Sequence, residues 1–478
     1  MIWKGVPLGF TGDDEPIDYH AKDDAGGDGP CTVLGPPGSF KSVGLVAPQL
    51  LDDDSGERNY YVFGDAKAEL CAITRKFRST VSHVAIANYA DLLGIKSDKW
   101  NPLNDLDPKA RGYGDACQAK AMAMIPPEPN DHNRHFTDGA RSAATLAIMR
   151  EVKRADAEGR PRDMRNVREF LLQDPDKLKA AIEEIMETGS YDERTRAAKF
   201  LKENTEIANL KSTIEVATSW MTEDICEDMA TAAGVDFSNA DRTRAKTIYS
   251  IVPANEMKAK GPYMRLKLST ALRGLYRHDG MPTTVIIEEA YVLGYHEEIE
   301  QALSILRGFG SRMTIVFQSY SQIRQLYPKT HGLFTAGALV AFRPGDIETG
   351  EMLVKRAGKP IVPVLSAADP SSPGEVKARP SWQQQARDRI PLDKMFGMPK
   401  GRALVWKPGD EKPRVSWVKG YFEIPELNKR ASPNPYYQGK SADAVAGADD
   451  EPAGKPNKSV GFVIAGLIVL VLLVLLRR

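Results

Sequence analysis

The sequence predicts an α/β protein with a parallel sheet, a phosphate-binding loop at the end of one strand and an inserted helical segment. A short apolar strand, Cys31–Leu34, runs into the glycine-rich stretch "GPPGSFKS" (35–42) and then into a helix. Strand-like and helix-like segments alternate on both sides of the insertion, as they do in βαβ units. From about 115 to 239, apolar residues instead recur every three or four positions, which predicts helices alone.

The predicted strands define a split sheet domain. "NYYVFGDAKAEL" predicts a strand, a loop and a helix, and "VSHVAIANY" predicts a further strand. Strands return at "KTIYSIVP", "TTVIIEEA", "RMTIVFQS", "GALVAF" and "RALVWK". We therefore expect a nucleotide-binding domain in two parts, 1–114 and 240–432, around an all-α domain at 115–239.

The composition of the chain limits which kinds of binding partner and metal site we expect. The 478 residues include 64 basic and 64 acidic side chains, so a nucleic-acid surface has to be local. Charges between 150 and 168 are of both signs, which favours a solvated helix face there. The four cysteines form no C-x-x-C pair, which predicts reduced thiols and no zinc site.

The C-terminal end predicts a membrane anchor. Residues 433–458 are rich in Ala, Gly, Asp and Pro, which is typical of a disordered linker. An uncharged apolar run, Val460–Leu476, follows, and at about 1.5 Å per residue it is just long enough to cross a bilayer. We expect 459–478 to be a single transmembrane tail. Basic residues flank it on both sides, so charge does not set its orientation.

The stretch 35–42 closely matches the phosphate-loop pattern G-x-x-x-x-G-K-[ST]. In such a loop, converging backbone N–H groups and a lysine bind the phosphates of ATP, and a hydroxyl ligates Mg²⁺. The lysine and the hydroxyl are Lys41 and Ser42. The candidate nucleotide-binding residues are Gly35, Gly38, Ser39, Phe40, Lys41 and Ser42.

Phe40 stands where the last glycine of that pattern belongs. A ring at this point should crowd the cradle, and a positive φ would be strained. We expect the ring to turn outward and pack on the following helix. Phe40→Gly should then tighten ATP binding, unless the ring is needed for packing.

Polar residues at two further strand ends complete a candidate catalytic set. Glu288 and Glu289 end the strand of "TTVIIEEA"; the first is placed to hold the Mg²⁺ shell and the second to polarise the attacking water. A buried strand that runs into an acidic helix start would give the same pattern. Gln318 ends the strand of "RMTIVFQS" and is a candidate for sensing the γ-phosphate or for capping the next helix. Arg307, on a glycine-rich turn, is a candidate arginine finger for a neighbouring subunit or a solvated side chain.

Taken in order, these motifs resemble the type IV secretion coupling proteins, motor ATPases of conjugative DNA transfer in the FtsK-like P-loop superfamily. The resemblance runs from about Pro7 to Tyr437 and includes "VFGDAKAEL", "KWNPLNDLDP", "VIIEEAYVLG", "RGFGSRMTIVFQSYSQIRQLY" and "AFRPGDIETGEML". Four residues depart from the family pattern: Phe40, Glu288 in place of Asp, and Ala66 and Ala68 in a segment that is usually D-P-K-G-E.

The resemblance implies a RecA-like nucleotide-binding domain that binds and hydrolyses Mg²⁺-ATP through Lys41, Ser42, Glu288 and Glu289. It implies that Gln318 senses the nucleotide and that Arg307 acts in trans within a homo-hexamer. The implied partners are DNA or nucleoprotein (the relaxosome), effector substrates, type IV secretion channel proteins and the membrane.

Our leading hypothesis is a membrane-tethered hexameric ATPase that couples recruitment of DNA or nucleoprotein to transport through a conjugation channel. It would lie in the inner membrane, with one C-terminal span and the motor in the cytoplasm. One alternative is a non-hydrolysing coupling receptor with a degenerate phosphate loop. Another is an unrelated tail-anchored ATPase that moves protein.

Overall fold

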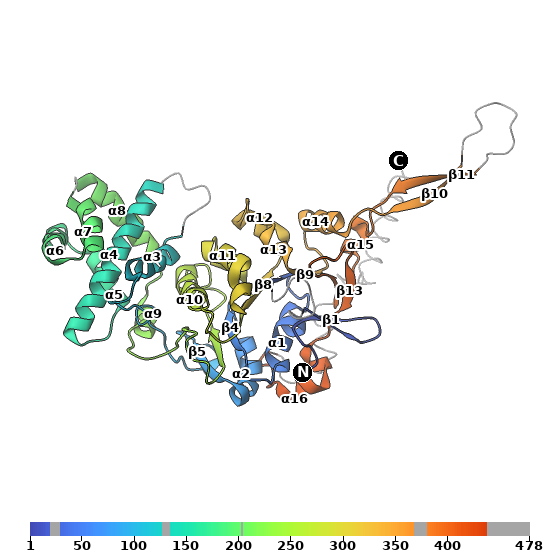
Figure 1. Cartoon of the computed structure of the whole chain (residues 1–478), viewed down its shortest axis with the longest axis horizontal. Coiled ribbons are helices and arrows are strands. Elements are labelled where there is room, and N and C mark those ends of the chain that lie inside the picture. The colour runs from blue at the N-terminus through green and yellow to red at the C-terminus, as the bar shows by residue number, and fades with distance from the viewer. Residues whose placement is uncertain (20–28, 127–133, 202–203, 368–379, 437–478) are drawn as a thin grey trace, which may run out of the picture. The chain divides into compact units, whose positions relative to one another are not determined.

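A large mixed sheet lies at the centre of the fold in the computed structural model, which describes residues 1–19, 29–126, 134–201, 204–367 and 380–436 (Figure 1). Over these residues the strand order is β2-β1-β13-β12-β9-β3-β8-β7-β4-β6-β5. The strands are β1 (Val6–Phe10), β2 (Pro16–Tyr19), β3 (Cys31–Leu34), β4 (Asn59–Phe63), β5 (His83–Ala87), β6 (Lys246–Ser250), β7 (Thr283–Ile287), β8 (Arg312–Phe317), β9 (Ala338–Phe342), β12 (Arg402–Trp406) and β13 (Arg414–Trp417).

The sheet has a parallel and an antiparallel part. All neighbouring pairs from β9 to β5 are parallel. The other four strands continue the sheet from β9 in antiparallel fashion. The predicted α/β class and parallel sheet are confirmed, whereas β1, β2 and β13 were not predicted. β2 and β13 have only four residues each, and β1 contains Pro7 and Gly9, residue types that are depleted in strands.

Alternate residues of the parallel strands enter two different hydrophobic cores. On β4, Tyr61 and Phe63 join one core, and Tyr60 and Val62 join the other. Helices α10 (Gly261–Gly274), α11 (Glu297–Ile305), α13 (Leu333–Ala336) and α14 (Ile347–Ala357) contribute to the first core. Helices α1 (Ala47–Asp52), α2 (Glu69–Val81) and α16 (Pro425–Arg430) contribute to the second. Burial on both faces explains why these strands read as continuous apolar runs.

The chain between β5 and β6 is helical, as the periodicity predicted (Figure 1). Side-chain caps begin several of these helices: Asp163 and Asp174 accept backbone N–H groups, and Ser190 forms a capping box with Glu193. The helices are α3 (Tyr113–Met124), α4 (Arg134–Glu158), α5 (Met164–Leu172), α6 (Pro175–Thr188), α7 (Tyr191–Ala197), α8 (Asn204–Ala217) and α9 (Glu223–Met229).

Polar contacts bind α3 to the sheet-covering helix α10. The buried Lys120 donates to Thr270 at 3.0 Å, and Arg265 donates to the carbonyl of Ala123 at 3.0 Å. The helical segment is thus attached to the sheet through side chains as well as through the chain itself. Its division at 115 and 239 into a separate domain stays a prediction.

The further helices are α12 (Tyr320–Leu326), between β8 and β9, and α15 (Leu392–Phe396), before β12. A hairpin of β10 (Ile361–Ala367) and β11 (Pro380–Ala386) forms a sheet of its own. No helix within the described ranges is long and apolar enough to cross a membrane. The predicted span, Val460–Leu476, and most of the predicted linker, 433–458, lie outside those ranges.

Lys267 of α10 is fully buried, and its ammonium group makes no hydrogen bond with the described part of the chain. The Nζ atom lies 3.8 Å from the ring centroid of Tyr263 and 5.9 Å from that of Trp100. Burial lowers the pKa of Lys267 to about 7, and the nearby Asp228 opposes this shift. In the folded protein, the amine of Lys267 therefore becomes neutral at a pH well below the ordinary pKa of a lysine.

Lys267→Met should make stability less dependent on pH. Between pH 7 and 10.5 the folded protein holds fewer protons at Lys267 than the unfolded chain does, so wild-type stability rises with pH in that window. The variant should be the more stable protein at pH 6. Above pH 7, the difference in free energy of unfolding between the variant and wild type should shrink by up to about 1.4 kcal/mol per pH unit, as measured by urea unfolding.

Lys260→Met is the matched control. Lys260 is also buried, but its Nζ atom donates to the carbonyl of Trp220 and to the hydroxyl of Thr222. This variant loses hydrogen bonds and should be destabilised at every pH. If the free energy of unfolding changes with pH in the same way for wild type and for Lys267→Met, then Lys267 does not titrate as described.

Candidate active site

The phosphate-loop motif forms a tight turn between β3 and the helix that follows. The Gly35 N–H donates to the carbonyl of Phe317 at 3.2 Å, which holds the start of the turn against β8. A Cβ atom on Gly35 would lie 2.5 Å from Ser39 Oγ, so the turn requires glycine at this position. Ser42 begins a single wide turn, η1 (Ser42–Val46), which continues into α1.

Lys41 is buried within this turn. Its Nζ atom donates to the carbonyls of Gly35 and Pro36 at 2.6 and 2.7 Å. Burial lowers the pKa of Lys41, while the charges of Glu289 and Glu288 oppose that shift. A phosphate oxygen is a stronger acceptor than a carbonyl, so a phosphate in the turn would compete for this ammonium group.

Phe40 adopts a left-handed backbone conformation, with φ +68°, two residues after Gly38 at φ +75°. This conformation costs a residue with a Cβ atom about 1–2 kcal/mol. The aromatic partner of the Phe40 ring is Phe422 of η6 (Tyr421–Glu423), at a centroid distance of 6.5 Å, and Lys400 Nζ lies 5.5 Å from the ring. We expected packing on the following helix; the aromatic contact is with the C-terminal segment instead.

Ser42 and Glu288, the two predicted Mg²⁺ ligands, are in contact. The Glu288 N–H donates to the carbonyl of Phe63, which continues the parallel pairing of β7 and β4 by one residue. The Ser42 hydroxyl lies near the Glu288 carboxyl group, and both residues line one cavity. Burial, with the charge of Asp65, raises the pKa of Glu288 to about 8, although the Ser42 hydroxyl opposes this shift.

Glu289 and Gln318 are also brought together. Gln318 Nε2 donates to Glu289 Oε2 at 3.4 Å, and the Gln318 N–H donates to the side chain of Gln322 at 3.0 Å. The cap of α12 is Ser319, whose hydroxyl accepts the Gln322 N–H. The helix-capping alternative for Gln318 is therefore wrong, and its amide side chain is directed at Glu289.

A cavity of about 200 Å³ opens between the loop, the strand-end acids and the chain after β4. Asp65 lines this cavity and is buried, and its carboxylate accepts the N–H groups of Leu70 and Cys71 at the start of α2. Burial raises the pKa of Asp65 to about 7, although these hydrogen bonds oppose the shift. Lys67 and Glu69 line the same cavity. We did not select these three as site residues, although the motif "VFGDAKAEL" contains them.

The donor set suits Mg²⁺ with a bound nucleotide. Over the described residues, no group of three His, Cys, Asp or Glu side chains is placed to hold a metal ion. Mg²⁺ commonly takes one or two protein ligands and completes its shell with phosphates and water. The hydroxyl of Ser42 and the carboxylate of Glu288 fit that requirement.

Arg307 does not join the other candidates. It is exposed in η5 (Leu306–Phe309), which precedes β8, whereas Gln318 follows β8. The two residues thus lie at opposite ends of one strand. Arg307 cannot reach the cavity of its own subunit, and its action in trans stays a prediction.

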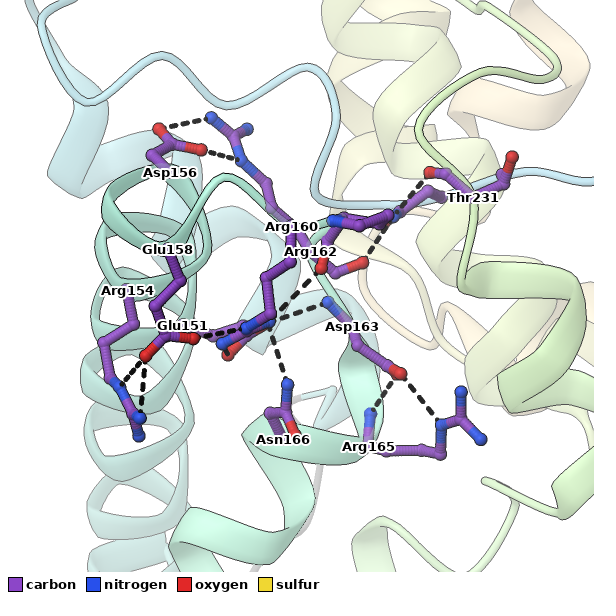
Figure 2. A network of polar contacts seen from close by, with 12 residues as sticks. Glu151, Arg154, Asp156, Glu158, Arg160, Arg162, Asp163, Arg165, Asn166 and Thr231 are labelled. Atoms are coloured by element: carbon purple, nitrogen blue, oxygen red, sulfur yellow. Dashed lines mark hydrogen bonds and ion pairs between the residues drawn. The ribbon is translucent and has the colours of Figure 1, made fainter.

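Several arginines around the α4–α5 loop are paired with acids (Figure 2). Arg160 makes two bonds to the buried Glu151, at 2.6 and 3.0 Å. Arg162 binds both carboxylate oxygens of Asp156 at 2.9 Å. Arg154 pairs with Glu158 on the helix surface. The prediction of interleaved charges holds, but part of the network is buried rather than solvated.

The same network also binds the two segments that connect the sheet to the helical part, one that precedes α3 and one that follows α9. Arg162 donates to the carbonyls of Leu103 and Leu106, at 2.6 Å each. The buried Asn101, from the motif "KWNPLNDLDP", donates to the carbonyls of Arg162 and Thr231 at 2.7 and 3.0 Å. One asparagine thus joins the chain segment that enters the helical part, the α4–α5 loop and the segment that leaves the helical part.

Comparison with known proteins decides the family. The model of the type IV secretory system conjugative DNA transfer family matches residues 19–437. The chain belongs to this family. The conjugal transfer protein TraG of Escherichia coli is 22% identical over 451 residues, which cover 87% of this chain and 69% of that protein. Protein VirD4 of Rhizobium radiobacter is 24% identical over 341 residues, 68% of this chain and 48% of that protein.

The match spans 52% of the TraG of Rhizobium radiobacter, so the chain covers about half the length of that member of the conjugative DNA transfer family. Among solved structures, the bacterial conjugative coupling protein TrwBdeltaN70 has a TM-score of 0.63 at 15% identity, over 87% of this chain and 89% of that one. TrwB in complex with ADP and Mg²⁺ has a TM-score of 0.59 over 86% of this chain and 89% of that one. These likenesses establish a shared RecA-like fold.

Arg160→Ala should cost more stability than Arg154→Ala. The first variant leaves the buried Glu151 carboxylate without its bidentate partner, at a cost of about 1–3 kcal/mol in urea unfolding. The second removes an exposed pair on α4 and should have a much smaller effect. Equal losses for the two variants would show that the Arg160–Glu151 contact does not organise the segment.

Proposed function

We propose that this chain is an Mg²⁺-dependent ATPase that drives DNA or nucleoprotein into a type IV secretion channel. The observation that carries the proposal is that Lys41 and Ser42 of the phosphate loop lie at the same sheet edge as Glu288, Glu289 and Gln318. The pairs Ser42–Glu288 and Glu289–Gln318 are the two that ATP hydrolysis requires, one for the metal and one for water. The TrwB complexes with ADP and Mg²⁺ and with an ATP analogue support the same choice of ligand.

Each residue has a defined part in this reaction. The loop N–H groups and Lys41 bind the β- and γ-phosphates, and Ser42 and Glu288 hold Mg²⁺, which neutralises charge that develops on the phosphates. Gln318 orients the attacking water, and Glu289 accepts its proton. Glu288 must be ionised to bind the metal, so its raised pKa makes metal binding release a proton near neutral pH.

The assembly we propose is a homo-hexamer in which Arg307 of one subunit reaches the nucleotide of the next. Its exposure on a glycine-rich turn, outside its own cavity, is compatible with that role. Residues 115–239 would form the domain that engages the relaxosome, effectors or DNA, while 1–114 and 240–432 bind nucleotide. Membership of the conjugative DNA transfer family supports channel proteins as further partners.

We further propose that residues 459–478 anchor the protein in the inner membrane with the ATPase in the cytoplasm, where ATP is available. The apolar run Val460–Leu476 supports this, and 433–458 would act as a linker.

A coupling receptor that does not hydrolyse ATP and has a degenerate phosphate loop is the second candidate. Two observations favour it: Phe40 has a strained backbone conformation, and Lys41 donates to carbonyls of its own loop.

Variants of the site should separate nucleotide binding from hydrolysis. Lys41→Ala should abolish both, because it removes the cation that binds the phosphates. Glu289→Gln should retain Mg²⁺-ATP binding but lose at least about a hundredfold in turnover, because the general base is lost. Turnover and ATP binding are to be measured on the full chain, with and without single-stranded DNA. No ATP binding by wild type at millimolar concentration would favour the receptor.

Deletion of 459–478 should release the protein from the membrane. The full chain should sediment with the membrane fraction of lysed cells, and the shortened chain should stay in the supernatant. A truncation that only removes 470–478 leaves too short an apolar run to span a bilayer and should also be released. A full-length protein found in the supernatant would contradict the anchor.

A further inference from the structure

The segment that follows β13 packs against η1, the helical turn that comes directly after the phosphate loop. A Cβ atom placed on Gly44, in the first turn after Lys41, would come within 2.4 Å of Val418 Cγ1 and 3.2 Å of the Lys419 carbonyl. Val418 is buried, and its N–H donates to the carbonyl of Gly401 at 2.7 Å. The loop helix and this C-terminal segment are therefore in close contact.

That segment also presents Phe422 to Phe40. The η6 turn that carries Phe422 is fixed by a bond from the Gly420 N–H to the Glu423 carboxylate at 2.6 Å. Lys400, whose ammonium lies near the Phe40 ring, directly precedes Gly401. Because Val418 is bonded to Gly401, Phe422 and Lys400 are held by one and the same antiparallel unit, built on β12 and β13.

The contact falls on the one strained residue of the loop. Phe40 has the left-handed backbone that glycine adopts freely, and the family's loop pattern has glycine at this position. Without a partner for its ring, a phenylalanine would favour ordinary backbone angles, and the following Lys41 would move with it. An aromatic pair and a cation over the ring offset a penalty of this kind.

We propose that Phe422, assisted by Lys400, is a positioning residue that holds Phe40 and thereby keeps the phosphate loop in the shape that binds ATP. The inference rests on the proposed ATPase function. It makes the C-terminal strands a structural support for the nucleotide site, at a position where the sequence has lost its glycine. It also implies that Phe40 and Phe422 depend on each other.

A double-mutant cycle tests this dependence. Fluorescent ATP-analogue affinity is to be measured for wild type, Phe422→Ala, Phe40→Gly and the double variant. Phe422→Ala should weaken binding by about three- to tenfold, the effect of losing one aromatic pair. In the Phe40→Gly background the same change should have no effect, because glycine needs no support. Phe422→Tyr keeps the ring and should bind as wild type does.

Phe77→Ala is the matched control. The Phe77 ring is covered by Arg430 at 4.9 Å, another aromatic–cation contact between α16 and the body of the protein, and it lies outside the cavity. This variant should leave nucleotide affinity unchanged. A loss equal to that of Phe422→Ala would mean that general destabilisation, and not positioning, explains the result, and would overturn the inference.

Amide hydrogen exchange without nucleotide keeps the inference separate from the proposed function. Phe422→Ala should speed exchange of residues 38–44 when Phe40 is present and leave it unchanged in the Phe40→Gly background. Equal acceleration in both backgrounds, or none in either, would overturn the role of Phe422. Absence of ATP binding in wild type would instead refute the ATPase, while the exchange data would still decide the inference.

Discussion

The parallel register of β3, β8, β7 and β4 is the constraint on which the candidate site depends. Leu34 is paired with Phe317, and Ile287 is paired with both Ile315 and Phe63. The residues that follow these strands therefore emerge at one edge of the sheet, as ligand-binding residues do in open α/β sheets. Since both faces of these strands are buried, a slip of one residue would move apolar side chains between the two cores and is strongly disfavoured.

Electrostatics gives that edge its preference for a cation. Asp65, Glu69, Glu288 and Glu289 line the cavity with only Lys41 and Lys67 to balance them. Two of the carboxyl groups, those of Asp65 and Glu288, have raised pKa values because they are buried near other acids. A divalent cation would relieve this repulsion and would carry the phosphates with it. The charges that line the cavity are thus better suited to a metal–nucleotide complex than to a nucleotide alone.

Sequence patterns predicted the parts of the structure that local rules govern. A buried strand with a polar residue at its end is visible in the sequence, and so Ser42, Glu288, Glu289 and Gln318 could be placed at one edge in advance. The partner of Phe40 could not be predicted, because Phe422 is remote in the chain and follows a strand, β13, too short to give a pattern. The pairing of Arg160 with Glu151 could likewise not be predicted from the sequence, because the sequence does not show whether a charged side chain binds water or another side chain.

The position of β1 has a consequence for how the chain folds as it is made. β1 pairs with β13, where Phe10 lies opposite Trp417, and the Ser416 hydroxyl donates to the carbonyl of Leu8. β1 and β2 are synthesised before β12 and β13, yet their place in the sheet exists only once those later strands have been made. Pairing over such a separation is slow because a long loop must close first. The β1–β2 hairpin therefore keeps an open edge until β13 has been synthesised, and during that period it can pair with wrong strand partners.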